Sequence, residues 1–105
     1  MSKDQVKKIV KIYADYLIRQ GFAFQSIYLY GSYARGNAHE WSDIDVAVIS
    51  PKFAGKDWDE NEQQLWRWRR DIDIRIQPLG FSPDEFEKNL SPLISEVKKT
   101  GIRIK

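Results

Sequence analysis

The segment from residue 31 to residue 45 constrains the fold of this chain more than any other. It begins with a small turn, Gly31-Ser32, and ends with two aspartates, Asp43 and Asp45, separated by one residue. Side chains on a strand alternate between its two faces, so a strand at this position points both aspartates the same way. Two carboxylates side by side supply the hard oxygen ligands that a divalent cation prefers. The segment therefore predicts a turn and a strand that share one cation-binding edge.

The Gly31-Ser32 turn also has the features of a phosphate-binding loop. A short run of β-branched and aromatic residues, Ile27 to Tyr30, precedes it as a predicted strand, and a short helix is expected from Ser32 to about Gly36. Backbone N–H groups and a hydroxyl at such a turn can bind a phosphate, especially where the turn opens a helix. Together with the aspartate pair, the turn predicts metal-dependent handling of a nucleoside triphosphate.

Composition excludes several other classes of protein. The chain has 105 residues, of which 42% are hydrophobic and 13% aromatic, which favours one folded domain over residues 1–105. It has no cysteine and one histidine, so disulfides, cysteine zinc sites and histidine-rich metal cages are excluded. The net charge is only +2, which makes nucleic acid an unexpected partner. Because no apolar run approaches the length of a signal peptide or membrane span, we expect a cytoplasmic protein without membrane contact.

The remaining pattern predicts helices and strands in the order helix-strand-helix-strand-helix-strand-helix-helix. The first helix has apolar residues at three- and four-residue spacing, and Ser2 and Gln5 could form its capping box. We therefore expect an α+β fold. The expected helices cover residues 3–19, 57–69 and 92–99 and a segment that starts at Pro83, and the expected strands cover residues 43–49 and 71–77. Residues 102–104 are either a closing edge strand or a frayed tail.

The segment Asp71 to Gln77 alternates between isoleucines and polar residues, which is typical of a half-buried strand. Phosphoryl and nucleotidyl transfer by two metal ions places the ions roughly 3.5–4 Å apart, and three carboxylates usually suffice to hold them. Asp43 and Asp45 would supply two of the three. A third would come from this neighbouring strand, and the spacing leaves Asp71 and Asp73 both open.

These residues resemble a known family, the minimal nucleotidyltransferases of the DNA polymerase beta superfamily. The mark of that family is Gly-Ser, about ten residues, and Asp-x-Asp; here the ten residues Tyr33 to Ser42 separate the turn from Asp43. The order of the predicted helices and strands is similar over nearly the whole chain. The resemblance implies a nucleotidyltransferase fold, in which helices flank a small mixed β-sheet.

The resemblance also implies roles for single residues. Gly31 would let the backbone approach the triphosphate closely, and Ser32 would hold its β- and γ-phosphates. Asp43, Asp45 and the third acid would be the catalytic carboxylates that bind Mg²⁺, with two ions expected and ATP as the substrate. We favour Asp73 as the third acid and general base, because it is expected to lie deeper in its strand, where a fixed rotamer is easier to enforce.

The activity implied by the resemblance is transfer of AMP from ATP to a hydroxyl group, with release of pyrophosphate. Minimal proteins of this family commonly pair with a small helical HEPN protein, and those with this motif spacing resemble antitoxins that AMPylate a tyrosine of that partner. Two alternatives remain open. One is a non-catalytic antitoxin or assembly subunit that acts by contact, and the other is nucleotidyl transfer to a small molecule or an RNA end.

The segment Trp66 to Arg70 interleaves aromatic and basic residues, as surfaces that bind single-stranded nucleic acid do. On a helix, Trp66 and Trp68 point about 200° apart, so they cannot form one stacking platform. The sequence leaves three interpretations open: a protein interface, ordinary packing and nucleic-acid binding. Arg35 lies in the helix expected after the turn and could reach a phosphate or the acceptor, but solvent exposure is the default expectation for Arg35 and for His39.

Overall fold

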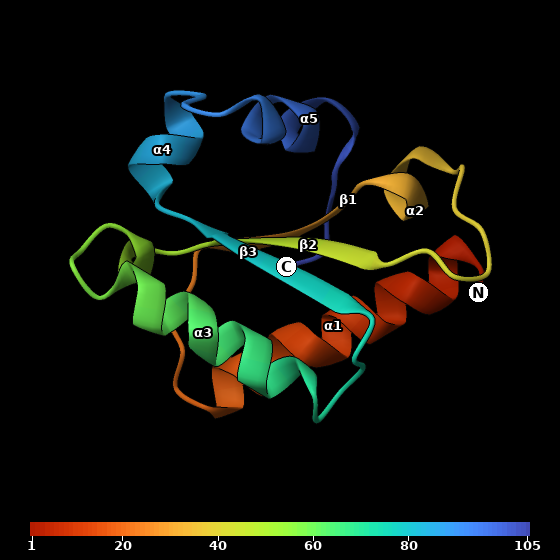
Figure 1. The fold of residues 1–105 in the computed structure, drawn as a ribbon, viewed down its shortest axis with the longest axis horizontal. Coiled ribbons are helices and arrows are strands. Elements are labelled where there is room, and N and C mark those ends of the chain that lie inside the picture. The colour runs from red at the N-terminus through yellow and green to blue at the C-terminus, as the bar shows by residue number, and fades with distance from the viewer.

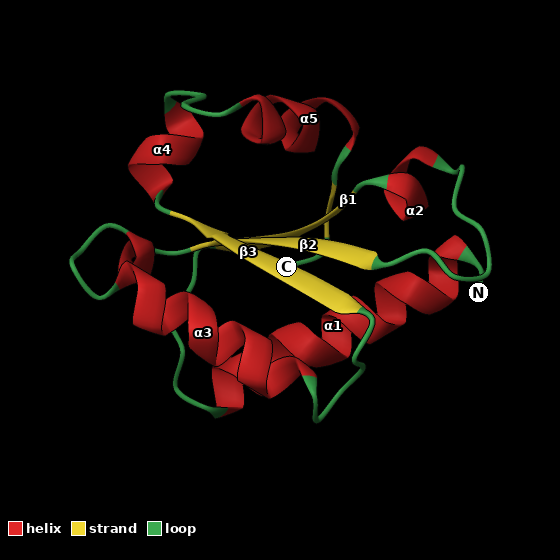
Figure 2. Cartoon of the chain, in the orientation of Figure 1, coloured by secondary structure: helices red, strands yellow, loops and turns green.

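The computed structural model describes residues 1–105 and shows a mixed four-stranded sheet with helices on both faces (Figure 1 and Figure 2). The strand order is β3-β2-β1-β4. The central strand β1 (Ser26–Tyr30) is antiparallel to β2 (Ile44–Ile49) and to the short β4 (Ile102–Arg103), whereas β3 (Ile76–Phe81) is parallel to β2. This arrangement confirms the predicted α+β class.

The helices form two layers around the sheet. Helices α1 (Lys3–Arg19) and α3 (Trp58–Arg69) cover one face, and α4 (Pro83–Glu87) and α5 (Pro92–Thr100) lie over the other (Figure 1). The single-turn helix α2 (Ser32–Arg35) lies beside the end of the sheet at which β2 begins. The parallel pair β2 and β3 is joined by the 3-10 turn η1 (Pro51–Phe53) and by α3, because parallel strands need a crossover connection.

Helix α1 forms where the sequence predicts it. Ser2 accepts a hydrogen bond from the Gln5 backbone N–H at 3.1 Å, and Gln5 Oε1 accepts one from the Ser2 N–H at 2.8 Å, which confirms the capping box. Burying one large apolar side chain contributes roughly 1.5–3 kcal/mol, so the apolar stripe of this helix anchors it to the sheet. The buried residues of the stripe are Val6, Val10, Tyr13, Ala14 and Leu17. None of the helices combines the length and apolar character that crossing a bilayer requires.

The strand expected at residues 71–77 is wrong in its position. The observed strand β3 starts at Ile76 and runs to Phe81, while residues 70–75 form turns that follow α3. Ile74, expected on a buried face, is 69% exposed. Pro78 and Gly80 lie inside the strand. Proline, which has no backbone N–H, is tolerated there because β3 is an edge strand and one of its sides needs no hydrogen bonds to another strand.

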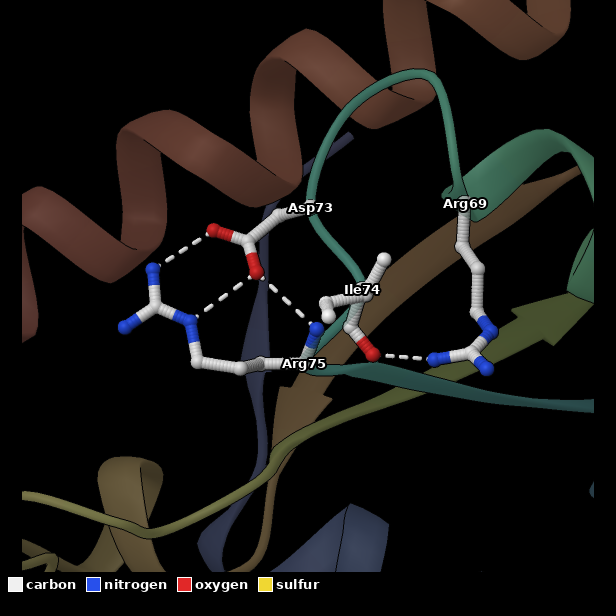
Figure 3. Close-up of polar contacts among 4 residues, drawn as sticks. All are labelled: Arg69, Asp73, Ile74 and Arg75. Atoms are coloured by element: carbon white, nitrogen blue, oxygen red, sulfur yellow. Dashed lines mark hydrogen bonds and ion pairs between the residues drawn. The ribbon is translucent and has the colours of Figure 1, made fainter.

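Local hydrogen bonds explain why a turn imitates the alternation of a strand. Asp73 Oδ1 accepts bonds from the Arg75 backbone N–H and Nε, both at 2.9 Å, and Oδ2 accepts one from Nη2 at 2.6 Å (Figure 3). Arg69, at the end of α3, donates to the carbonyl oxygen of Ile74 and, at 3.3 Å, to that of Ile76. These contacts hold the turn that precedes β3 in the chain.

The aromatic residues of α3 point apart, as predicted. Trp68 packs edge-on against Phe22, with ring centroids 5.8 Å apart and an interplanar angle of 81°. The Arg69 guanidinium lies over the Trp66 ring, 4.7 Å from its centroid. Trp68 therefore belongs to the core, and Trp66 is covered by a neighbour on its own helix.

Replacing Gly80 by alanine tests how β3 packs on η1. A Cβ at Gly80 would overlap the ring of Phe53, which is only 6% exposed. Overpacking of this kind costs about 1–3 kcal/mol, so urea unfolding should show that loss for Gly80→Ala. Gly55→Ala is the matched control, because a Cβ there meets no atom within 4 Å. Equal stability of the two variants would contradict this packing.

Candidate functional site

An open cavity of about 440 Å³ lies where β2 begins, beside α2. The cavity brings together three of the predicted site residues, Ser32, Asp43 and Asp45, although ten residues separate the turn from the first aspartate. The full lining consists of Ser32, Arg35, Asn37, His39, Trp41, Ser42, Asp43 and Asp45. Both halves of the motif thus face one space.

Strand pairing places the glycine turn against the second aspartate. In the antiparallel pair of β1 and β2, Tyr30 lies opposite Asp45, so the next residue, Gly31, passes directly over the Asp45 side chain. Gly31 has φ +77°, and a Cβ built on it would overlap the Asp45 carboxylate. A residue without a side chain is required here both for the backbone conformation and for this close approach.

The loop between the two halves of the motif is held by its own hydrogen bonds. Ser42 Oγ accepts a bond from the His39 N–H at 2.9 Å, and the Ser42 N–H donates to the His39 carbonyl at 3.0 Å. Ser42 is buried, whereas Trp41 beside it is 83% exposed at the rim of the cavity. The turn fixes the approach of the chain to Asp43 and leaves an aromatic ring free at the entrance.

The Asp45 carboxylate lies in an unfavourable electrostatic environment. Burial first, and then the negative charges of Asp43 and Glu96, raise the pKa of Asp45 to about 6, against a lowering by Arg35. The same environment raises the pKa of Tyr30, by burial first and then by the charges of Asp45 and Glu96. A cation bound at this end of the cavity would relieve the repulsion between the carboxylates.

One ion pair near the cavity has no signal in the sequence. Arg35 of α2 forms an ion pair with Glu96 of α5, which links the glycine-serine turn to the helix layer above the sheet. Arg35 and His39 are both exposed, as expected, and both line the cavity. Glu96 lies 61 residues beyond Arg35, and a contact over that distance leaves no local pattern in the sequence.

The third predicted carboxylate does not join the other two. No group of three or more histidine, aspartate or glutamate side chains in the structure is placed to hold a metal ion. Asp73, predicted deep in a strand, lies in the turn before β3 and pairs with Arg75, which lowers the pKa of Asp73. Asp71, the alternative, accepts a hydrogen bond from the Tyr16 hydroxyl at 2.5 Å. The placement of Asp73 in the sequence-based prediction is therefore wrong.

The chemistry of the donor set fits one divalent cation. Asp43 and Asp45 present hard oxygen atoms to the same polar cavity, and the half-buried Asp45 lies next to two other negative charges. Mg²⁺ is often bound through only one or two carboxylates together with substrate phosphates. A second ion held by a third carboxylate finds no matching group.

A second hollow of about 500 Å³ lies at the opposite ends of β2 and β3, between η1, α3 and α4. Its lining includes Trp58 and three carboxylates, Glu62, Asp84 and Glu85, and no basic side chain. Burial raises the pKa of Glu62 there. Because this hollow has neither the glycine-serine turn nor a basic side chain to attract phosphate, it is not the candidate site.

Comparison with known sequences identifies relatives of the chain. Residues 6–104 match the sequence pattern of the family described as "Nucleotidyltransferase domain". The chain is 33% identical to "Putative protein adenylyltransferase MJ1305" of Methanocaldococcus jannaschii, in an alignment over 75% of this chain. The alignment covers 56% of that relative, so the chain spans only about half of its length.

Solved structures show the same fold. A protein described as a "putative nucleotidyltransferase from Sulfolobus solfataricus" superposes with a TM-score of 0.71 at 17% identity, over 96% of this chain and 80% of that one. A structure described as "the toxin-antitoxin with AMP-PNP" superposes with a TM-score of 0.64 at 24% identity, over 90% of this chain and 72% of that one. These similarities confirm that the expected fold is the nucleotidyltransferase fold.

The strained environment of Asp45 predicts that Asp45→Asn stabilises the metal-free protein at neutral pH. The pKa of Asp45 is about 6 in the folded chain, against an ordinary value of 3.8, so ionisation costs stability as the pH rises through that window. The expected gain above this window is on the order of 1 kcal/mol, after allowance for solvent screening of a half-exposed carboxylate.

Thermal unfolding in a chelating buffer at pH 4 and pH 8 measures this effect. The difference between Asp45→Asn and the unchanged protein should be small at the lower pH and favour the variant at the higher pH. Asp59→Asn, on the exposed start of α3, is the matched control and should show no such dependence. A variant that is less stable than the unchanged protein at pH 8 would contradict the described environment.

Proposed function

Because this chain belongs to the nucleotidyltransferase domain family, we propose that it transfers AMP from ATP to a hydroxyl group of a partner protein. The observation that carries the proposal is the cavity in which Ser32, Asp43 and Asp45 meet. In the reaction, the acceptor oxygen forms a bond to the α-phosphorus, and the bond from that phosphorus to the pyrophosphate oxygen breaks. Pyrophosphate leaves, and the hydroxyl proton passes to water in the open cavity.

The residues of the cavity divide the binding of ATP between them. Gly31 lets the backbone approach the triphosphate, and Ser32 offers a hydroxyl to the β- and γ-phosphates. Arg35 lines the same cavity, and its guanidinium offsets phosphate charge. The exposed Trp41 at the rim supplies an apolar surface for the base or for the acceptor chain.

Asp43 and Asp45 are the residues that would hold Mg²⁺. The ion supplies charge neutralisation at the phosphate oxygens when it is bound. The hard oxygen donors of the pair and the negative field around Asp45 support this assignment. Their positions also keep the carboxylates beside the turn, so the same end of the sheet binds metal and phosphate.

The acceptor we propose is a tyrosine hydroxyl of a small helical partner of the HEPN type. This partner would be a toxin, and AMPylation of the tyrosine would neutralise it. The printed name of the sequence relative, a protein adenylyltransferase, supports a protein acceptor. One of the solved structures with this fold is described as a toxin-antitoxin, which supports the antitoxin context. The cavity is open to solvent, so a side chain of another protein can reach it.

A second candidate function is neutralisation of a toxin by contact alone. A complete set of three carboxylates would argue against this alternative, and the structure does not assemble such a set. The two functions differ in their dependence on Asp43. A binding subunit keeps its effect when the carboxylate is removed, whereas an enzyme loses it.

Asp43→Asn tests the transfer reaction directly. The chain is incubated with Mg²⁺, ATP labelled on the α-phosphate and a small helical protein of the HEPN type, and label on that protein is counted. We expect the rate of label transfer by the variant to fall at least about a hundredfold, because a charged metal ligand stabilises the transition state by several kcal/mol. ATP labelled on the γ-phosphate should leave no label on the acceptor.

Asp59→Asn is the matched control, because it makes the same chemical change on the exposed first turn of α3. It should transfer label at the unchanged rate. Label transfer that survives Asp43→Asn would contradict the enzyme proposal, and neutralisation of the partner by that variant would favour contact alone. Transfer of the γ-label would indicate a kinase reaction instead.

A further inference from the structure

The residue that lies beside Asp45 on the neighbouring strand is Gln77. In the parallel register of β2 and β3, Asp45 pairs with Gln77 as Ile44 pairs with Ile76. Paired residues of adjacent strands point to the same face, and the strands lie roughly 4.8 Å apart. Ile44 and Ile76 are both fully buried in the core beneath α1 and α3, so Asp45 and Gln77 share the opposite face.

The apolar residues of the same strands confirm this orientation. Two positions further along, Ala47 of β2 and Leu79 of β3 pair with each other and pack in the cluster below α4 and α5. Gln77 is half-buried. Its side chain therefore lies on the same face of the sheet as Asp45, at the neighbouring strand position and beyond the lining of the cavity itself.

Neither of the other acids near the site can take this position. Both oxygens of Asp73 are used by Arg75, in a turn that ends before β3 begins. Glu96, whose charge acts on Asp45, is held by the Arg35 guanidinium from another layer of the fold. The strand position next to Asp45 on β3 thus carries a neutral amide.

We infer that this chain is a one-ion nucleotidyltransferase, in which Gln77 occupies the place of a third metal-binding carboxylate and Asp73 is a structural residue. The inference rests on the proposed function, since it concerns how the same site binds its cation. Asp43 and Asp45 hold a single divalent ion. Gln77 is a positioning residue that offers its N–H₂ group and its carbonyl to groups bound beside Asp45, without adding charge.

Adding a carboxylate at Gln77 should therefore create stronger cation binding. A new negative charge next to Asp45 raises the affinity for a divalent ion by at least about tenfold, since each tenfold corresponds to only about 1.4 kcal/mol of attraction. Removing the charge at Asp73 should change nothing at the metal site, because that charge is already neutralised by Arg75.

The test is a titration with Mn²⁺ alone, in which the free ion is measured by electron paramagnetic resonance. The full chain is compared with Gln77→Glu, with Gln77→Ala as the matched uncharged control, and with Asp73→Asn. We expect one ion per chain for the unchanged protein and for Gln77→Ala and Asp73→Asn, and binding at least about tenfold tighter for Gln77→Glu. Circular dichroism confirms folding, and Gln77→Asp replaces Gln77→Glu if the longer side chain unfolds the protein.

The possible results separate the inference from the function on which it rests. Two ions on the unchanged protein, with one lost in Asp73→Asn, would overturn the inference, and so would one ion with no gain in the carboxylate variant. An unchanged protein that binds no Mn²⁺ would instead overturn the metal site of the proposed function itself. The AMP-transfer assay with Asp43→Asn tests that function separately.

Discussion

The pairing of Tyr30 with Asp45 across β1 and β2 is the contact on which the candidate site depends. It places the Gly31-Ser32 turn, which follows β1, over the carboxylate of Asp45, near the start of β2. Gly31 permits the approach because a Cβ at its position would overlap that carboxylate. The cavity, the spacing of the motif and the position of α2 all follow from this crossing of backbone and side chain.

The same contact places the Asp45 carboxylate near other negative charges, and a bound cation would offset this repulsion. Asp45 is half-buried between Asp43 and Glu96, and only Arg35 opposes their charges. Strain of this kind is typical of functional sites, where stability is lower than a neutral sequence would give. The fold supplies the stability elsewhere, in the buried stripe of α1 and the isoleucines and valines of the sheet. The site can therefore keep a negative field that attracts a cation.

The sequence predicts most of the local structure of this protein, such as helix caps and turns, and few of its tertiary contacts. The capping box of Ser2, the amphipathic α1 and the glycine-serine turn follow from short-range rules, and the structure confirms their placement. The strand expected at residues 71–77 was misplaced because Asp73 and Arg75 make a hydrogen-bonded turn that alternates like a strand. The roles of Gly31, Ser32 and the two aspartates in binding ATP and Mg²⁺ stay predictions.

Two features of the site could not be obtained from the sequence at all. The position of Gln77 beside Asp45 depends on the register of a parallel pair, which no local pattern encodes. The contact of Arg35 with Glu96 depends on how α5 packs over the sheet. The sequence therefore predicts the third acid in the nearest acidic segment, whereas the strand position beside Asp45 carries an amide.

The most direct test of the account is a crystal structure of the chain with Mn²⁺ and a non-hydrolysable ATP analogue. The account predicts a triphosphate against the Gly31-Ser32 turn and an anomalous signal for manganese between Asp43 and Asp45. Nucleotide bound instead in the hollow beside Trp58 and Glu62, or a metal ion bound at Asp73, would contradict the claim that the turn and the aspartate pair form one site.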